Sequence, residues 1–279
     1  MTAYPQYSVP LELPCVMGVL NITPDSFSDG GRFAGFGTAV EHGLAMERDG
    51  AAIIDVGGES TRPGSDSVSL EEELRRTIPA IMALQLRARA AISVDTCKAE
   101  VARRALAAGA KIVNDVSALR SDPEMVDVVA EHGCGVCLMH MQGLPKTMQE
   151  DPRYDDVVGE VLAFLEQRME WAIAHGVREE QIAVDPGIGF GKTVEHNLLL
   201  LQHLHRFTEL GRPVVLGTSR KYFLGELLQL EPRDRAVGTA ATTVMGALAG
   251  AAIFRVHDVK PNREALRVAQ AVLEAGEGA

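Results

Sequence analysis

The residues with the clearest chemical potential stand where short apolar segments of the sequence end. Eight such segments are visible, and each is followed by a polar or charged residue. The residues at these eight ends are Asn21, Asp55 to Gly58, Asp95, Asn114 with Asp115, His140, Asp185, Thr218 to Lys221, and Arg255 to His257. A single buried polar residue at such a place is usually satisfied by backbone groups. Carboxylates, amides and cations that converge on one edge instead suit a polar heterocycle together with an anion.

The residue types suggest which side chains take which part of such a ligand. Asp95, Asn114 and Asp185 suit the edge of a nitrogen-rich ring, because a carboxylate accepts two parallel N–H bonds. Arg255 and His257 are alternate residues beyond a predicted strand, so they point to the same side and can jointly bind phosphate. Arg255 could also stack on a flat ring. Residues 218–221 are predicted to open a helix, where backbone N–H groups attract phosphate or carboxylate.

A glycine-rich segment, 185–193, imitates a phosphate-binding P-loop without matching it. Its Gly-Lys-Thr end has the right form, but the first glycine of the pattern would fall on Pro186. The dinucleotide-binding pattern also fails, because its last glycine would fall on Lys192. We interpret these glycines as allowing the backbone to pass close to a ligand.

The stretch 17–31 shows how the chain delivers reactive residues. Its apolar run changes at Asn21 into the polar, glycine-containing sequence ITPDSFSDGG. Functional side chains are often carried by loops that a rigid scaffold positions. We therefore expect a buried strand to bring Asn21 and a reactive loop to one rim.

The eight apolar segments have the length of strands, and most are continuous rather than alternating. Such a pattern indicates strands that are covered on both faces, as in a parallel sheet. The predicted strands span residues 15–20, 51–56, 91–94, 111–113, 135–139, 181–184, 213–216 and 251–256.

Helical patterns fill the gaps between these strands. Thr38-x-x-Glu41 and Ser69-x-x-Glu72 are predicted capping boxes, and an alanine-rich helix over 98–108 is expected to stop at Gly109. Further helices are predicted from 121 onward and over 158–173, 198–204, 236–249 and 262–273. Eight strand-then-helix units over about 250 residues predict an α/β fold, a single-domain (β/α)8 TIM barrel. The barrel would span 15–279 after an N-terminal extension over 1–14, and an open doubly wound sheet is the alternative.

Composition and charge restrict the classes of partner. The 279 residues include 27 basic and 38 acidic ones, and the net charge of -11 disfavours a general nucleic-acid or anionic-membrane surface. Residues 236–254 carry no charge, but glycines and threonines interrupt them, so a helix and a buried strand fit better than a membrane span. Residues 1–14 lack the pattern of a signal peptide, which favours the cytoplasm.

The four cysteines do not form a disulfide framework in a chain of this length. Cys134 and Cys137 form a CxxC pair, but no second pair completes a zinc site. The sequence around them continues as a predicted strand. We interpret both as buried thiols, with a redox or metal-binding role as the alternative.

Eight blocks of sequence span nearly the whole chain in a specific order. They are MGVLNITPDSFSDGG (17–31), DVGGESTRPG (55–64), SVDT (93–96), NDVSAL (114–119), LMHMQGLPKTMQ (138–149), DPGIGFGK (185–192), GTSRK (217–221) and RVHDV (255–259). In this order they resemble the blocks of dihydropteroate synthases, a family of pterin-binding TIM barrels. The resemblance implies a transferase of folate biosynthesis. It would join 6-hydroxymethyl-7,8-dihydropterin diphosphate to p-aminobenzoate, giving 7,8-dihydropteroate and pyrophosphate.

The resemblance also implies roles for individual residues, a Mg2+ cofactor, a homodimer and sensitivity of the family to sulfonamides. Pterin would be held by Asp95, Asn114, Asp185 and Lys221, with Arg255 stacked over it. The diphosphate would be held by Asn21, Thr61, Arg62, Arg255 and His257, with Asn21 also a magnesium ligand. The p-aminobenzoate carboxylate would bind Ser219, and its ring would pack near Phe27, Pro63 and Phe190. The expected catalytic residues are Asp29, Arg62, Lys221 and His257.

These residue types suit a reaction in which the C–O bond to pyrophosphate breaks before the amine attacks. Carboxylates would stabilise the positive pterin, with Asp29 near the methylene cation, while cations stabilise the departing anion. The loops over 23–33 and 60–69 are expected to close over pyrophosphate and exclude water, so that pterin binds first. A pterin-dependent methyltransferase and a catalytically silent pterin-binding paralogue are the alternatives.

Overall fold

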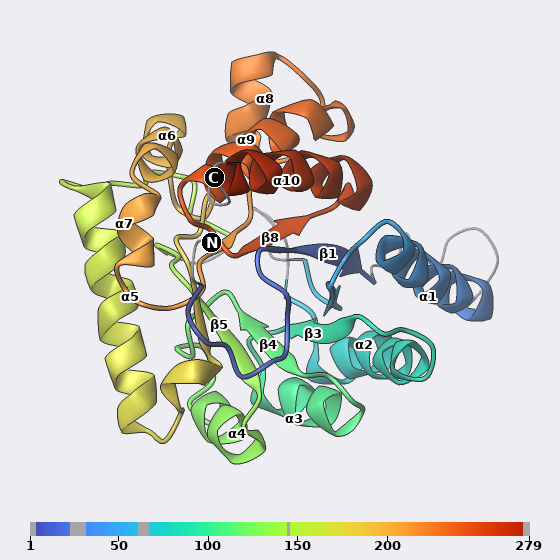
Figure 1. Ribbon diagram of the computed structural model, residues 1–279. Helices are drawn as coiled ribbons and strands as arrows, with labels where there is room; N and C mark the ends of the chain where they lie inside the picture. Colours follow the sequence, from blue (N-terminus) through green and yellow to red (C-terminus); the bar gives the residue numbers. More distant parts are fainter. Residues whose placement is uncertain (1–3, 23–31, 61–66, 144–145, 276–279) are drawn as a thin grey trace.

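The computed structural model describes residues 4–22, 32–60, 67–143 and 146–275, with only the backbone described for 32–36. Within these ranges, strands and helices alternate along the chain (Figure 1). The strands are β1 (Cys15–Asn21), β2 (Ile53–Gly57), β3 (Ala91–Asp95), β4 (Ile112–Asp115), β5 (Gly135–Met139), β6 (Ile182–Asp185), β7 (Val215–Leu216) and β8 (Ile253–Val256). Every predicted strand overlaps an observed one. β2, β4, β5 and β6 are buried along their whole length, as expected for strands covered on both faces.

The strands form one closed parallel barrel. Neighbouring strands pair in the order β6-β5-β4-β3-β2-β1-β8-β7, and every pair is parallel. The two ends of this order meet through a parallel bridge between Val184 and Val214, and the Val184 N–H donates to the Pro213 carbonyl at 3.0 Å. The (β/α)8 barrel is therefore confirmed, and the open sheet is excluded. Parallel strands bring all eight carboxyl ends to one rim.

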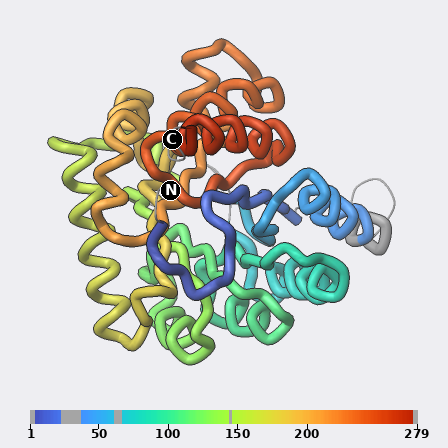
Figure 2. Tube along the Cα trace, in the orientation of Figure 1, coloured from blue at the N-terminus to red at the C-terminus, as the bar shows by residue number. Residues whose placement is uncertain are grey.

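Helices surround the barrel (Figure 2). They are α1 (Arg32–Arg48), α2 (Leu70–Gln85), α3 (Ala99–Ala107), α4 (Met125–His132), α5 (Val157–Ala174), α6 (Val194–Gln202), α7 (His205–Thr208), α8 (Tyr222–Leu228), α9 (Ala236–Leu248) and α10 (Val259–Glu274). The short helix α7 adds to the predicted set, and α8 begins directly after residues 218–221, where a helix was predicted to open. The segment 236–254 forms α9 followed by β8, and no helix within the described ranges is long and apolar enough to cross a membrane.

The two larger hydrophobic cores of the described residues hold the barrel together. The larger core lies between the strands and the surrounding helices, where Ile54 and Val94 pack with Ile81 and Leu84 of α2. The smaller core fills the amino end of the barrel with Met17, Ile53, Ile112, Ala183 and Ile253. The N-terminal segment crosses in front of this end in Figure 1 and covers it with Tyr4, Tyr7, Val9, Leu11 and Leu13. The amino end is therefore closed, which leaves the carboxyl rim for chemistry.

The two predicted capping boxes have different outcomes. The Ser69 side chain accepts a hydrogen bond from the Glu72 N–H at 3.3 Å and begins α2, which confirms the N-cap half of that prediction. The Glu72 carboxylate, which would complete the capping box, instead accepts bonds from Arg75 and Arg76. The Thr38 prediction is wrong, because Thr38 lies inside α1, which already begins at Arg32. A capping-box pattern can also occur inside a helix, and the glycines before Thr38 weaken α1 without ending it.

The cysteine thiols are free, and those of Cys134 and Cys137 are buried, as predicted. Burial raises the pKa of Cys134 to about 12 and the pKa of Cys137 well above its ordinary value. A thiol with a raised pKa is a poor nucleophile and a poor metal ligand at neutral pH. Within the described residues, no group of three or more His, Cys, Asp or Glu side chains could hold a metal ion.

Candidate active site

A buried cluster of charged side chains lies at the carboxyl rim, where β2, β3, β4 and β8 end. The Arg255 guanidinium donates through Nε to Asp55 Oδ2 at 2.7 Å and through Nη2 to Asp95 Oδ2 at 2.6 Å. The Asn114 amide donates to the same Asp55 oxygen at 3.0 Å. Three predicted pterin-binding residues, Asp95, Asn114 and Arg255, are thus brought together. The link between them is Asp55, a strand-end residue to which the sequence assigned no role.

Several buried oxygen atoms of this cluster have no hydrogen-bond partner among the described residues. Asp55 Oδ1 and Asp95 Oδ1 are buried and have no hydrogen-bond partner among the described residues, and the same holds for the Ser93 hydroxyl. Asp55 and Ser93 are partners in the β2–β3 register, and Ser93 and Asp95 face the same side of β3. Buried polar atoms are normally paired in folded proteins, so these oxygens are suited to accept N–H groups of a ligand.

The charges of the cluster are strongly coupled. Burial raises the pKa of Asp95 to about 7, against the opposing effect of Arg255, and the neighbouring Asp55 charge raises it further. Burial alone would lower the pKa of Arg255, but Asp55 and Asp95 raise it, so the guanidinium stays charged. One cation, Arg255, therefore faces two carboxylates. The Asp95 carboxylate, whose pKa is raised, can gain a proton or bind a positive group of a ligand.

Asp185 ends β6 and lies on the other side of the same rim. Its Oδ1 accepts the Gly187 N–H at 2.7 Å, and burial raises its pKa despite that bond. Gly217 lies beside it: a Cβ atom built there would be 3.8 Å from Asp185 Oδ2 and 3.9 Å from Arg255 Cβ. Asp185 and Arg255 therefore lie on either side of Gly217, which has no side chain to separate them.

Lys221 and Phe190 form a second pair of predicted site residues. The Lys221 ammonium lies 3.8 Å from the centre of the Phe190 ring, close enough for a cation–π interaction. Lys221 is the N-cap of α8, and Phe190 belongs to the glycine-rich loop after β6. A predicted pterin-binding residue and a predicted p-aminobenzoate-binding residue thus meet directly.

Ser219 and His257 form a third pair, between the loop after β7 and the end of β8. The Ser219 hydroxyl oxygen accepts the His257 backbone N–H at 3.1 Å and lies 3.0 Å from His257 Nδ1. Arg220, between Ser219 and Lys221, has a positive φ of 59° and is held by two bonds to Asp258, at 3.0 and 2.7 Å. The Arg220–Asp258 pair thus fixes the turn that presents Ser219 and Lys221.

Asn21 ends β1 next to the cluster of Arg255, Asp55 and Asp95. A Cβ atom at Gly57 would lie 3.3 Å from Asn21 Oδ1 and 3.5 Å from Asp95 Cβ, so the three positions are close neighbours. The remaining predicted site residues, Phe27, Asp29, Thr61, Arg62 and Pro63, lie outside the described residues.

The structure also shows residues whose importance the sequence did not indicate. Lys192 and His140 are buried at the rim, and the Lys192 ammonium lies 2.9 Å from His140 Nδ1. Asp115 accepts the backbone N–H groups of Ser117 and Leu119 and so shapes the turn after β4. His140 and Asp115 stand at strand ends in the sequence, and Lys192 ends the block DPGIGFGK, but the sequence assigns none of the three a role in the site.

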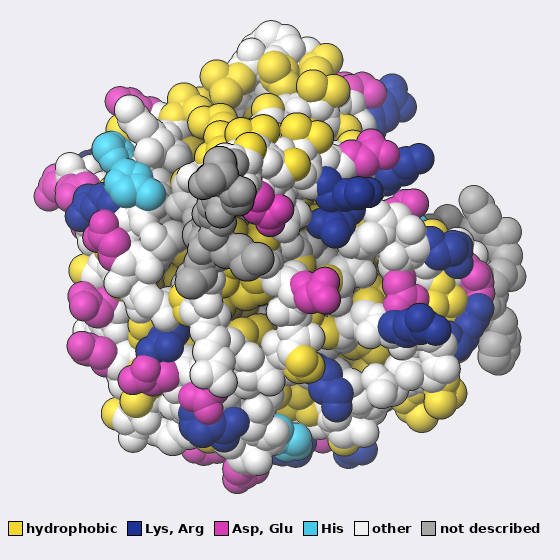
Figure 3. All heavy atoms as spheres, in the orientation of Figure 1, with side chains coloured by type: hydrophobic (Ala, Val, Ile, Leu, Met, Phe, Trp, Pro, Cys, Tyr) yellow, Lys and Arg dark blue, Asp and Glu magenta, His cyan; other side chains and the backbone are white. Residues whose placement is uncertain are grey.

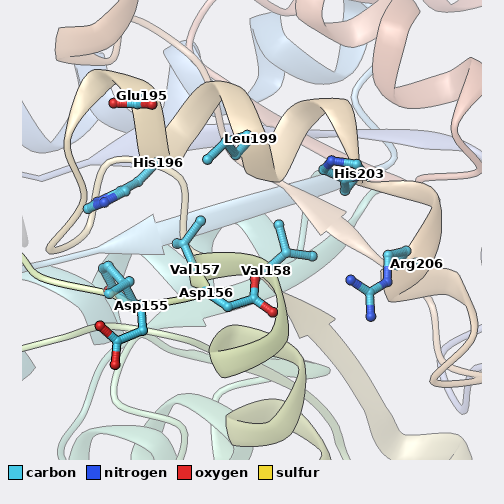
Figure 4. A pocket seen from close by; sticks show the side chains of 10 residues that line it. Asp155, Asp156, Val157, Val158, Glu195, His196, Leu199, His203 and Arg206 are labelled. Carbon is cyan, nitrogen blue, oxygen red and sulfur yellow. The ribbon is translucent and has the colours of Figure 1, made fainter.

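A surface pocket of about 370 Å³ lies elsewhere, between the start of α5 and the helices α6 and α7 (Figure 4). Its lining includes Asp156, His196, His203 and Arg206. None of the predicted site residues lines it. The pocket is therefore separate from the convergent polar rim.

The fold and the rim together define a class: a closed parallel barrel enzyme whose strand ends present buried carboxylates and cations to a polar ligand. A family model described as "Pterin binding enzyme" matches residues 17–257. The dihydropteroate synthase of Escherichia coli K12 is 49% identical over 97% of this chain and 95% of that protein.

Solved structures agree with this match. A Yersinia pestis dihydropteroate synthase with a sulfonamide drug complex has a TM-score of 0.91 at 43% identity, covering 97% of this chain and 98% of that one. A Xanthomonas albilineans dihydropteroate synthase with 4-aminobenzoic acid has a TM-score of 0.91 at 46% identity, covering 97% and 99%. The chain belongs to the dihydropteroate synthase family of pterin-binding enzymes, which are transferases of folate synthesis.

Proposed function

We propose that the protein condenses 6-hydroxymethyl-7,8-dihydropterin diphosphate with p-aminobenzoate to give 7,8-dihydropteroate and pyrophosphate. The observation that carries this proposal is the pair of buried, unpartnered carboxylate oxygens on Asp55 and Asp95. A pterin ring carries a row of N–H groups, and carboxylate oxygens are the acceptors that such a row requires. The relative that contains 4-aminobenzoic acid supports the second substrate.

The pterin site is proposed to lie among Asp95, Asn114 and Asp185, with the Lys221 ammonium beside it. Arg255 pairs with Asp55 and Asp95 through one edge of its guanidinium. This pairing fixes the plane of the guanidinium, and a fixed guanidinium plane suits stacking on a flat ring. Arg255 can therefore hold the carboxylates in place and cover the pterin without leaving them.

The diphosphate is proposed to bind Asn21, Thr61, Arg62, Arg255 and His257. Mg2+ commonly takes one or two protein oxygens together with substrate phosphates and waters, so the single amide oxygen of Asn21 fits a metal that the diphosphate brings with it. When bound, such an ion would stabilise negative charge on the leaving group. The protein's own net charge of -11 makes this local capture of the anion necessary.

p-Aminobenzoate is proposed to bind with its carboxylate at Ser219 and its ring near Phe27, Pro63 and Phe190. The Ser219 hydroxyl is held by the His257 backbone, so its position is set before the ligand arrives. Phe190 is 7% exposed and offers its ring from a packed cluster. A pre-positioned hydroxyl and ring reduce the entropy that binding must overcome.

The chemical step is proposed to separate charge. The C–O bond breaks first, its electron pair leaves with pyrophosphate, and the pterin methylene becomes a cation delocalised into the ring. The amine nitrogen of p-aminobenzoate then forms the C–N bond and loses one proton. Asp95 and Asp185 would stabilise the positive ring, and Asp29 the methylene carbon, while Arg62 and His257 would stabilise the departing anion. Lys221 would orient the pterin for this step.

The order of binding follows from the same arrangement. We propose that the loops over 23–33 and 60–69 complete the p-aminobenzoate pocket once pyrophosphate is present, so that pterin diphosphate binds first. Tight binding of p-aminobenzoate to the empty enzyme in calorimetry would contradict this order.

A homodimer is proposed from an apolar surface on α9 and α10. Val237, Met245, Leu248, Val268 and Val272 are between 54% and 82% exposed. Figure 3 shows hydrophobic side chains gathered over the region that α8, α9 and α10 occupy in Figure 1. A large exposed apolar patch on a soluble protein usually marks an interaction surface, and a second copy is the partner always present.

We further propose that the enzyme works in the cytoplasm, with small molecules as its substrates.

The test of the proposed activity is product formation in the presence of Mg2+. Dihydropteroate and pyrophosphate are expected in equal amounts, and only when both pterin diphosphate and p-aminobenzoate are supplied. Pterin binding with neither product would instead indicate a catalytically silent paralogue. Methyl transfer from a pterin, without release of pyrophosphate, would indicate the methyltransferase alternative.

A further inference from the structure

Lys192 is a buried lysine whose direct partners are all uncharged. It is 3% exposed, and its ammonium lies 2.9 Å from the Gly187 carbonyl oxygen, 3.0 Å from the Phe190 carbonyl oxygen and 2.9 Å from His140 Nδ1. An ammonium has three donors, and here each has one acceptor. No carboxylate of the described residues forms an ion pair with Lys192.

This arrangement is costly for the protein to maintain. Burial lowers the pKa of Lys192 to about 7, although the Asp185 charge acts in the opposite direction and the Lys221 charge adds to the lowering. Burial and the Lys192 charge also lower the pKa of His140 to about 2, so its imidazole is neutral and its Nδ1 accepts the bond. A lysine that is buried without a paired carboxylate is generally kept only for a specific purpose.

The purpose is indicated by the turn that Lys192 holds. Gly187, Gly189 and Gly191 all have positive φ, at 69°, 80° and 62°. A Cβ atom at Gly187 would lie 1.8 Å from the His140 carbonyl oxygen, and one at Gly191 would lie 2.4 Å from the Gln142 carbonyl oxygen. The glycine turn is therefore pressed directly against the backbone that follows β5, and no other residue type fits.

Side-chain donors hold the other carbonyl groups of this turn. The Gln149 amide donates to the Gly189 carbonyl at 2.7 Å, and the Tyr154 hydroxyl donates to the Gly191 carbonyl at 2.8 Å. Lys192 binds the carbonyls of Gly187 and Phe190, on either side of the turn's centre. The turn also has a backbone bond of its own, from the Phe190 N–H to the Gly187 carbonyl at 3.1 Å. Lys192 therefore adds side-chain bonds to the carbonyls at both ends of this bond.

The side chain that this turn presents is Phe190. Its ring packs against Val116, Met139, Met141 and Met148 and lies under the Lys221 ammonium. A shift of the turn would move the Phe190 ring, and with it the neighbour of Lys221. The backbone bonds of Lys192 therefore control two predicted substrate contacts without touching substrate.

We propose that Lys192 is a positioning residue for p-aminobenzoate, because its ammonium fixes the turn that places the Phe190 ring. The inference rests on the proposed function, in which that ring lines the p-aminobenzoate pocket. It adds a residue to the site and explains why the glycine-rich segment ends in Lys without being a P-loop.

The kinetic test compares Lys192→Met with Lys260→Met, a matched change at an exposed lysine of α10. Methionine keeps the length and apolar stem of lysine but removes the ammonium. In Lys192→Met, the KM for p-aminobenzoate should rise by about tenfold or more, while kcat and the KM for pterin diphosphate stay within about threefold. An unchanged KM for p-aminobenzoate, or equal losses in all three constants, would overturn the proposal.

A second, milder variant tests the same role in case Lys192→Met does not fold. Tyr154→Phe removes only the donor to the Gly191 carbonyl and keeps the ring. It should raise the KM for p-aminobenzoate by about threefold, in the same direction as Lys192→Met and with kcat preserved. A fall in kcat with KM unchanged would contradict the positioning role.

A third measurement is independent of catalysis and uses the unaltered protein. Nitrogen NMR of labelled histidine should show His140 neutral, with its hydrogen on Nε2, throughout the range from pH 5 to pH 8. A His140 that gains a proton within this range would remove the acceptor and overturn the proposal. Absence of dihydropteroate from the unaltered enzyme would instead disprove the proposed function, so the two failures are distinguishable.

Discussion

At the scale of single residues, the site is defined by charges that are buried but not fully matched. Arg255 faces both Asp55 and Asp95, and each carboxylate keeps one oxygen without a partner among the described residues. Such a triad contributes little to stability by itself, because desolvation offsets most of the attraction between the charges. We propose that its value lies in function, because its carboxylates would already be in place for a positive ligand ring.

Asp95→Asn should separate pterin binding from folding. The change removes a charged acceptor and places an N–H donor near Arg255, so the Kd for pterin diphosphate should rise by about 30-fold or more, which corresponds to about 2 kcal/mol. Calorimetric titration measures this effect, with the exposed Asp127→Asn of α4 as the matched control. Equal affinity in the two variants would show that Asp95 does not bind pterin.

Lys221 and His257 should have different roles. Lys221→Ala is expected to weaken pterin binding by about tenfold, because it removes a donor beside the ring. His257→Ala should leave pterin binding unchanged and slow the release of pyrophosphate. Titration and rapid-quench measurements on both variants check this, and the reverse pattern would mean that the two roles are exchanged.

The sequence indicated most of these residues but not their contacts. Asp95, Asn114 and Arg255 stand at strand ends, so a barrel must bring them to one rim. The bond between Arg255 and Asp55 joins residues 200 positions apart and depends on side-chain conformations that no local pattern encodes. Lys192 was missed for a similar reason, because its partners are backbone carbonyls.

At the scale of elements, hydrophobic runs predicted the strands well because both faces of each strand are buried. Helix starts were predicted less reliably. Ser69 is confirmed as an N-cap, whereas Thr38 lies inside α1. The short helix α7 has no pattern long enough to be recognised. Length and burial therefore decide which elements a sequence reveals.

Ser69→Ala should reduce the stability of the fold. Loss of the bond to the Glu72 N–H is expected to lower the free energy of unfolding by about 1 kcal/mol. Chemical denaturation measures the change, and Ser67→Ala, at an exposed residue two positions earlier, is the control. A loss no larger than that of the control would show that the cap is dispensable.

At the scale of the whole molecule, the barrel separates stability from chemistry. Residues 4–14 and the smaller core close the amino end, while the polar residues of all eight strands meet at the carboxyl rim. The sequence predicted the boundary before Cys15 but not this covering role. Tyr4, Tyr7 and Val9 follow neither a helical nor a strand period, so only tertiary packing reveals their contacts.

The proposed dimer can be tested on α9 and α10. The double variant Met245→Glu/Val268→Glu places two charges on the apolar surface and should convert a dimer into a monomer, as measured by sedimentation equilibrium. Leu86→Glu, at a residue of 87% exposure after α2, is the control and should leave the mass unchanged. A dimer that survives the double change would place the interface elsewhere.

We propose that buried carboxylates stabilise a pterin cation, so that the C–O bond breaks before the amine attacks. Positional isotope exchange tests this directly. The pterin diphosphate would carry 18O in the bridge between carbon and phosphorus, with Mg2+ present and p-aminobenzoate absent. We predict that the label moves into non-bridging positions. Label that stays in the bridge, on enzyme that forms dihydropteroate once p-aminobenzoate is added, would contradict the account.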